Sequence, residues 1–483
     1  MIEFDFTDRP YNKQHRINAP KGNMKTQALI FAVVVLFLGT DVEAASIKTA
    51  SGTRKVLTKF ALDDDLATVV GNAEDSLTSH VKGWKISRQA TAEDLKLSDV
   101  FFRVDEATTV ELTNVKLSNS PVVGINYVKP NLEFLNMGVD VDLGSLEVTG
   151  SFKVASKSVL SVIPATTIGE FSLTFSDVQA TGRVGLSLVE DSFTTINYDI
   201  NFEPKEEVLK TMYRDHDGSI LTSVATEQQE LSISAKINRE LQATLKNILK
   251  EEFDDILSEM SVDELMGDTK KSADYRAHAK AVRTVANEYV DEVLLYVHNY
   301  VVEQHVEEIQ IPNIEAGFSE TILWVTWHGE FVAQQGHLRS LASLQRTADV
   351  SLEFNSDTGA IIVFGSLGLE ELQLGYDYYS AKFMDIGPTG TVGISVGSNS
   401  IFVRVNLVIA TEPVIGLEDL HIEYAKGINI DVTGLGILDW LVSNIATWVV
   451  GTFNDEIVGS LDGMIHGLVM DMLPSVDPSK YFA

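Results

Sequence analysis

Hydrophobic positions along this chain follow helical spacing, then strict alternation, then helical spacing again. Apolar residues three and four apart predict an amphipathic helix from about Leu62 to Trp84. The alternation that follows predicts half-buried antiparallel strands, each with one face turned inward. These strands are expected at 146–154, 171–175 and 196–202. After a polar stretch at 205–230, an apolar stripe from Ile237 to Met260 predicts another long helix.

The same order of patterns returns further along the chain. Helical spacing between Val282 and Val301 predicts a helix that ends near Pro312, because proline cannot continue it. Strands are expected at 350–354, 372–378 and 401–409. The helical pattern between Leu435 and Leu473 would form a helix roughly 55–60 Å long if continuous, so the sheet must lie along it.

These repeated patterns predict an α+β protein with two tandem modules, spanning residues 60–266 and 275–473. The polar segment Gly267–Ser272 is the expected boundary between them. A length of 483 residues agrees with more than one domain, since a single core rarely serves so long a chain. A sheet wrapped along a helix can enclose an apolar interior or pack into a filled core. Periodicity does not decide between these two alternatives.

The N-terminal region has the pattern of a secretory signal peptide. Met24-Lys25 precedes Ala28–Gly39, a run rich in Val, Leu and Phe, and the small or aliphatic residues that follow it predict cleavage after Ala44. The apolar run is shorter than the roughly 20 residues that a membrane span requires. We therefore predict a secreted, extracellular protein from which residues 1–44 are removed, with residues 1–23 interpreted as an upstream start.

Charge and composition exclude several classes of function. The chain has 37 basic and 69 acidic residues, a formal net charge of −32 and a pI near 4.6. Such a charge repels phosphate backbones and anionic headgroups, so we expect no nucleic-acid partner. The chain has no cysteine, which excludes disulfides, thiolate metal sites and cysteine nucleophiles.

Short motifs that suggest catalysis or metal binding lack the context that either chemistry needs. Gly393–Gly397 matches G-x-S-x-G, but the pattern places Ser395 within a strand rather than on a strand-to-helix turn. His298 and His305 are seven residues apart on a predicted helical segment, too far to bind one ion without further ligands. We therefore predict a protein that is not an enzyme and has no cofactor or metal.

Parts of both modules resemble a known family. Gly434–Leu441 and the run that continues to Phe453–Asp455 resemble the group 7 mite allergens. Asp94–Val100 and Val110–Val115 resemble the early strands of that family more loosely. The family is related in fold to the juvenile-hormone-binding and takeout proteins, and to the bactericidal/permeability-increasing and lipopolysaccharide-binding proteins.

The resemblance implies a strongly curved antiparallel sheet around a long helix in each module, and the carriage of a lipid or another hydrophobic ligand. Two features depart from the related proteins. The disulfide typical of the hormone-binding and bactericidal branches is absent here, and the strong negative charge replaces the basic tip that captures bacterial lipid. Two modules in one chain are similar to the bactericidal relatives rather than to the single-module mite proteins.

The favoured hypothesis is a secreted, non-enzymatic carrier that holds a lipid, fatty acid, sterol-like or terpenoid molecule in an apolar tunnel. Residues on the helical stripes are the expected lining: Leu241, Leu245 and Ile248 in the first module, and Val293, Val297, Val301, Leu441, Ile445 and Trp448 in the second. The alternative is a secreted acidic interaction protein with filled cores, acting in recognition or defence without a bound lipid. No membrane span is expected after signal cleavage.

Overall fold

A computed structural model describes most of the chain after its first 59 residues. The described residues are 60–83, 95–105, 108–156, 165–214, 220–222, 227–311, 313–322, 325–355, 358–370, 372–383, 387–409, 413–434 and 458–482. They belong to one compact unit, Ala50–Ala483. The predicted signal peptide at 1–44 and the stretch 435–457 lie outside the described residues.

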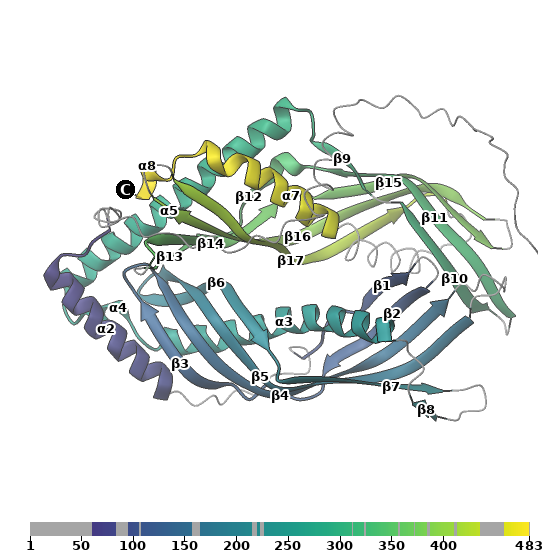
Figure 1. Ribbon diagram of the computed structural model, residues 1–483, viewed down its shortest axis with the longest axis horizontal. Coiled ribbons are helices and arrows are strands. Elements are labelled where there is room, and N and C mark those ends of the chain that lie inside the picture. The colour runs from purple at the N-terminus through teal and green to yellow at the C-terminus, as the bar shows by residue number, and fades with distance from the viewer. Residues whose placement is uncertain are drawn as a thin grey trace, which may run out of the picture. The chain divides into compact units, whose positions relative to one another are not determined.

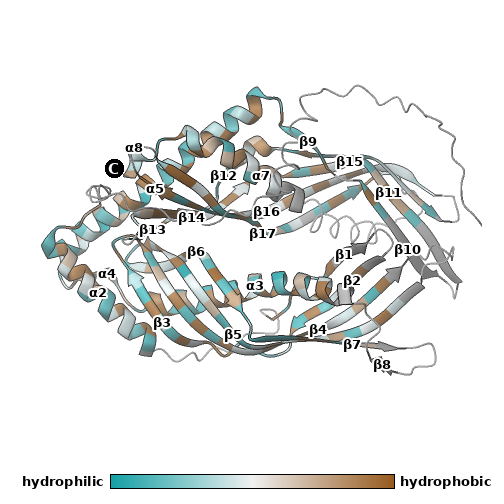
Figure 2. Ribbon diagram, in the orientation of Figure 1, coloured by the Kyte–Doolittle hydropathy of each residue, from teal (hydrophilic) through white to brown (hydrophobic). Residues whose placement is uncertain are grey.

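Among the described residues, eight strands form an antiparallel sheet, called here the first sheet. They are β1 (Val100–Asp105), β2 (Thr108–Leu117), β3 (Gly124–Asn131), β4 (Asn136–Ser156), β5 (Ala165–Val189), β6 (Ser192–Glu203), β7 (Glu206–Arg214) and β8 (Ile220–Thr222). The order is β1-β2-β4-β5-β7-β8, with β3 on β4 and β6 on β5. Buried and less buried residues alternate along β6, and hydropathy alternates in the same way along the strands (Figure 2).

Three helices in the described part of the chain accompany the first sheet: α2 (Asp64–Gly83), α3 (Glu227–Ser258) and α4 (Val262–Met266). The Asp63 carboxylate accepts a hydrogen bond of 2.7 Å from the Leu66 N–H, which satisfies one of the free donors at the start of α2. Helix α3 packs mainly on β6 and also on β1, and its length runs along the first sheet (Figure 1). Its apolar stripe therefore faces the sheet, as the helical spacing predicts.

Nine described strands form the second sheet, which is also antiparallel. They are β9 (Glu308–Ile311), β10 (Ile314–Ile322), β11 (Val325–Arg339), β12 (Leu344–Arg346), β13 (Ser351–Asn355), β14 (Ala360–Leu369), β15 (Gln373–Phe383), β16 (Thr389–Val408) and β17 (Val414–Val432). The helical elements with it are α5 (Thr269–Glu303), η2 (Leu341–Ser343), α7 (Val458–Met472), η5 (Leu473–Ser475) and α8 (Ser479–Phe482). The α+β class with large antiparallel sheets is confirmed.

Helix α5 contributes to two separate hydrophobic cores. Tyr275 and Ala279, near its start, pack in the core of the first sheet. From Val282 onward its buried residues pack in the core of the second sheet. The Asp268 carboxylate caps the helix by accepting from the Lys270 and Lys271 N–H groups at 2.7 and 3.1 Å. One continuous helix therefore connects the two cores.

One local expectation from the sequence is wrong. The helix expected to reach Pro312 ends at Glu303, and Glu308–Ile311 form β9, which pairs with β11. The alternation of Ile309 and Ile311 suits a strand, so the chain leaves the helix before the proline. The polar stretch at 205–230 contains β7 and β8, because Thr211 and its neighbours complete the sheet beside β5.

Polar side chains connect the first sheet to the second sheet. The Asp199 carboxylate on β6 accepts a hydrogen bond of 2.7 Å from the Arg404 guanidinium on β16, and lies 3.4 Å from Arg183 on β5. Arg183 also pairs with Glu353 on β13. Nearby, the Asn197 amide donates to the Asp349 carbonyl at 2.8 Å. Ionic and amide contacts, rather than an apolar seam, carry this part of the connection.

None of the described helices combines the length and the apolar character that crossing a membrane would require.

Candidate ligand-binding site

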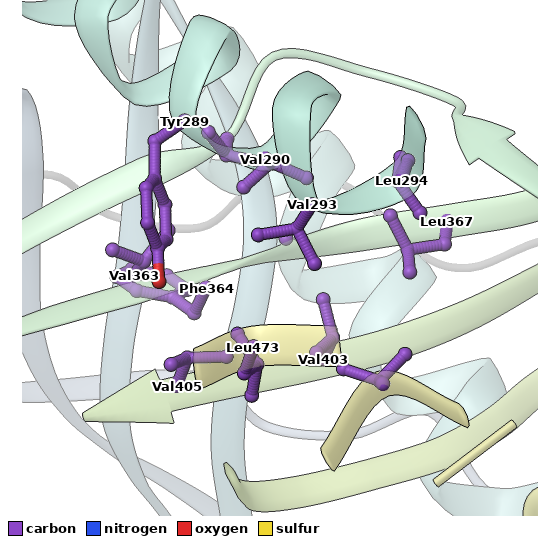
Figure 3. Close-up of a pocket in the computed structure, with 13 residues that line it drawn as sticks. Tyr289, Val290, Val293, Leu294, Val363, Phe364, Leu367, Val403, Val405 and Leu473 are labelled. Carbon is purple, nitrogen blue, oxygen red and sulfur yellow. The ribbon is translucent and has the colours of Figure 1, made fainter. Parts of the chain in front are cut away.

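A small apolar cavity lies between α5, the second sheet and the C-terminal helical segment (Figure 3). Its lining is Tyr289, Val290, Val293, Leu294, Val350, Val363, Phe364, Gly365, Leu367, Val403, Val405, Val469 and Leu473. The cavity volume is about 30 Å³, room for one or two water molecules and much less than a lipid occupies. A lipid-sized ligand therefore needs the surrounding elements to move apart.

Local geometry explains why these residues meet. On α5, Tyr289 and Val293 are four residues apart, so they lie on the same face of the helix one turn from each other. On the sheet, Val363 of β14 pairs with Val405 of β16, and the next pair on that face begins with Gly365. A Cβ at Gly365 would lie 2.8 Å from a methyl group of Val350, which is too close. Glycine therefore allows this close approach.

Tyr289 supplies a polar atom in this apolar lining. Its side chain is 1% exposed, and its hydroxyl has no hydrogen-bond partner within the described part of the chain. Burial raises the pKa of Tyr289, so the hydroxyl stays protonated at neutral pH. Figure 3 shows the ring directed from α5 toward Val363 and Phe364. A buried hydroxyl without a partner is destabilising, so its presence calls for an explanation.

The C-terminal segment packs against α5 beside Tyr289. The rings of Tyr481 and Phe482 meet the Tyr289 ring edge-on, with centroids 5.7 and 5.3 Å away. The Tyr481 hydroxyl donates to the Glu292 carboxylate, which also pairs with Lys480. Aromatic contacts and one shared carboxylate therefore hold α8 next to the cavity.

The unpartnered hydroxyl gives a stability prediction. Tyr289→Phe is expected to raise the free energy of unfolding of the ligand-free protein by about 1 kcal/mol, because it removes a desolvated hydroxyl. Tyr275 on the same helix is the matched control: it is equally buried, and its hydroxyl donates to the Leu132 carbonyl at 3.1 Å. Tyr275→Phe is expected to lower the same quantity by about 1 kcal/mol. Urea unfolding measures the free energy of unfolding of both variants. Changes of the same sign in the two variants would contradict the conclusion that the Tyr289 hydroxyl lacks a hydrogen-bond partner.

The residues that the sequence predicts to line a tunnel have different surroundings in the structure. Val293 lines the cavity, whereas Val297 and Val301 are buried in the same core but are not lining residues. Leu241 and Leu245 are buried in the core of the first sheet. Ile248 is half-buried on α3. Leu441, Ile445 and Trp448 lie outside the described residues. A binding role for any of these residues stays a proposal.

Lining residues on the sheet were missed by the sequence reasoning. Strand β14 (Ala360–Leu369) is apolar almost throughout, and most of its residues are buried. A continuous apolar run of this kind indicates a strand buried on both faces, which is the signal that could have found Val363 and Leu367. Apolar stripes on helices are easier to recognise in a sequence than strands buried on both faces. The predicted lining therefore contains helix residues alone.

The short motifs that suggested catalysis or metal binding do not form a site of either kind among the described residues. Ser395 is exposed on β16 and pairs with Gln373 and Asn429, so no strand-to-helix turn presents it. The Nδ1 atom of His298 hydrogen-bonds to the Ala342 carbonyl at 2.9 Å. His305 lies beyond the end of α5, so the two histidines do not share a helix. Within the described ranges, no group of three or more His, Asp and Glu side chains could hold a metal ion.

Comparison with family models gives a match for each half of the chain. Residues 285–473 match the model of the group 7 allergens. Residues 72–267 match the model of the haemolymph juvenile hormone binding proteins. The resemblance found in the sequence is therefore confirmed, with a different branch of the related proteins matching each part.

Solved structures give weaker likenesses. Takeout 1 of Epiphyas postvittana is 16% identical, with 44% of this chain and 87% of that chain covered and a TM-score of 0.21. A lipopolysaccharide binding protein is 8% identical, with 84% and 89% covered and a TM-score of 0.18. TM-scores this low carry no argument about how the elements are arranged. None of the curated proteins matches the chain in sequence.

Proposed function

We propose that this protein is a secreted, non-enzymatic carrier of a hydrophobic ligand. The observation that carries the proposal is the apolar cavity between α5, β14, β16 and α7, within the residues that match the group 7 allergens. The match of residues 72–267 to haemolymph juvenile hormone binding proteins supports a binding function, because that family is named for binding juvenile hormone. Burial of the apolar surface of such a ligand contributes about 25 cal/mol of favourable free energy for each Å² removed from water.

The finer architecture belongs to the same proposal. We infer two tandem modules, at 60–266 and 275–473, each with a strongly curved sheet around a long helix. Ligand-binding positions proposed from the helices are Leu241, Leu245, Ile248, Val293, Val297, Val301, Leu441, Ile445 and Trp448. The signal-peptide pattern supports secretion with removal of residues 1–44. We also propose that the protein has no nucleic-acid partner.

The small cavity volume supports a second candidate function. With about 30 Å³ of free space, this site among the described residues is close to filled. A filled core suits a secreted acidic interaction protein that binds its partner through the surface. Under that function, the protein takes up no hydrophobic molecule.

Native mass spectrometry of protein recovered from the culture medium separates the two functions. The carrier is expected to show a bound mass at one or two copies per chain, which solvent extraction then identifies as a lipid or a related molecule. The same spectrum should give a chain that begins at Ala45. A bare chain that also takes up no fatty acid, fatty ester or sterol would overturn the carrier in favour of the interaction protein.

A further inference from the structure

Helix α5 passes from the core of the first sheet into the core of the second sheet between Ala279 and Val282. Two short segments contact the helix around this crossing point. One is the turn 132–135 between β3 and β4, and the other is the loop 347–350 between β12 and β13. These two segments are called here the collar. They belong to different halves of the chain, so the collar joins the two cores at the helix that they share.

The turn between β3 and β4 contacts α5 through its backbone carbonyl groups. The buried Tyr275 hydroxyl donates to the Leu132 carbonyl at 3.1 Å, and the Nε2 atom of His278 hydrogen-bonds to the Glu133 carbonyl at 2.8 Å. The Leu132 N–H group donates to the Glu74 carboxylate on α2 at 2.7 Å. Both backbone groups of Leu132 therefore have a side-chain partner from a helix, which fixes the turn against α2 and α5.

The same turn places one side chain in the other core. Phe134 is 6% exposed and packs in the core of the second sheet, with its ring centroid 6.0 Å from that of Phe354. Its neighbours Leu132 and Leu135 pack in the core of the first sheet. The φ angle of Leu135 is 55°, a left-handed conformation that is unfavourable for a leucine. A strained backbone of this kind persists only where surrounding contacts over-determine it, and here those contacts come from both cores.

The loop between β12 and β13 contacts α5 through Asp349. The Asp349 carboxylate lies 3.0 Å from Arg283 Nε and accepts a hydrogen bond of 2.8 Å from the Asn287 amide. The Val350 N–H group donates to the side-chain oxygen of Asn287 at 3.0 Å. On the side of the first sheet, the Asn197 amide on β6 donates to the Asp349 carbonyl at 2.8 Å. Asp349 therefore binds α5 with its side chain and the first sheet with its main chain.

The two segments of the collar contact α5 from opposite sides. His278 and Asn287 are nine residues apart, which is about two and a half turns of an α-helix. The helix therefore cannot tilt or slide in one core without displacing the contacts that the collar makes with the other core. Tightly packed interiors transmit such displacements because they have little free space.

We propose that the collar is a coupling joint between the two cores. A change in the packing of the second core alters the stability of the first core through the collar, although the two cores are separate hydrophobic clusters. The inference does not depend on the carrier function, because it concerns the ligand-free chain. Its consequence is that any event that repacks one half of the protein also changes the stability of the other half.

Hydrogen exchange of the ligand-free full chain tests this joint. Leu374 is buried on β15 in the second core and lies outside the collar, so Leu374→Ala places a perturbation in that core. Exchange is followed in peptides from β5 for the first core and from β14 for the second core. In the wild-type background, Leu374→Ala is expected to raise the exchange rates of the slowest amides in both cores by the same factor, on the order of a hundredfold.

Removal of a collar contact should confine that effect to one core. In the Asp349→Ala background, Leu374→Ala is expected to accelerate exchange in β14 and to leave β5 at the rate of Asp349→Ala alone. Asp291→Ala is the matched control, because Asp291 also pairs α5 with an arginine, Arg346 on β12, at 2.7 Å, but lies outside the collar. In that background both cores should again respond by the same factor.

A second collar variant keeps the test valid if Asp349→Ala does not fold. Asn197 has a φ angle of 51°, which glycine adopts without strain. Asn197→Gly therefore removes the amide that binds the Asp349 carbonyl and leaves the backbone in place. It is expected to confine the effect of Leu374→Ala to β14 in the same way.

Three results would overturn the inference. The first is acceleration confined to β14 in the wild-type background, because the cores would then not be coupled. The second is equal acceleration of both cores in the collar variants, because the continuous helix or the contacts of Asp199 would then carry the coupling. The third is confinement in Asp291→Ala as well, because any weakened contact of α5 would then have the same effect. None of these results decides the carrier function, which native mass spectrometry tests separately.

Discussion

Replacement of Asp199 by alanine is expected to lower the free energy of unfolding by about 3 kcal/mol. Its carboxylate lies between two guanidinium groups, at 2.7 Å from Arg404 and 3.4 Å from Arg183, and its side chain is only 12% exposed. Removal of the carboxylate leaves two partly buried cations facing each other without their shared partner. Because the three residues come from β5, β6 and β16, the loss also weakens the connection between the two sheets.

The matched control for Asp199→Ala is an ion pair of similar geometry on the surface. Glu308 accepts a hydrogen bond of 2.7 Å from Arg339, and both side chains are about half exposed. Water and salt screen this pair, so Glu308→Ala should cost less than 1 kcal/mol. Urea unfolding of both variants measures the difference. Equal losses would mean that burial of Asp199 has no energetic consequence.

Leu367→Ala is expected to lower the free energy of unfolding by about 3 kcal/mol and to increase the uptake of hydrophobic ligands. Leu367 is 2% exposed and lines the cavity on β14, so its truncation enlarges a space that is already open. A ligand that fills the enlarged space binds only the folded state. Addition of methyl palmitate should therefore recover part of the lost stability by mass action.

Leu374→Ala provides the comparison for the cavity variant. Leu374 is 3% exposed in the same core, on β15, but it does not line the cavity. Its truncation should reduce stability by a similar amount without greater ligand uptake. Equal uptake by the two variants would contradict the placement of the binding site, because a general loosening of the core would then explain both results.

Much of the fold follows from the periodicity of the sequence. The strands expected at 146–154 and 196–202 lie within β4 and β6, and the strand expected at 401–409 lies in β16 except for its last residue. Strand β7 was missed because Glu206, Glu207 and Lys210 make it look polar. It forms because β5 offers an unpaired edge beside it, and that information is not local to the segment.

The site was less predictable than the fold. Val293 and Val297 are the same residue type, one turn apart on one helix, and both are buried. The first lines the cavity and the second does not, because the distinction depends on which strand and which C-terminal residue lie opposite. Periodicity identifies the buried face of a helix, but it does not locate space along that face.

Two polar features could not be predicted from the hydrophobic pattern of the sequence. Asp199 occupies an alternating strand position that normally faces water, and its burial arises from Arg404, 205 residues away along the chain. Tyr289 fits an apolar stripe equally well whether its hydroxyl is bonded or not. In both cases the decisive contact is between distant segments, so only the folded structure reveals it.

Photolabelling with a diazirine-bearing fatty acid methyl ester tests whether a hydrophobic ligand occupies the cavity beside α5. A ligand in the cavity is expected to label peptides that contain Tyr289–Leu294, Phe364–Leu367 or Val469–Leu473, and excess methyl palmitate is expected to suppress the labelling. Labels confined to exposed positions, or labelling of these peptides that methyl palmitate does not reduce, would contradict it.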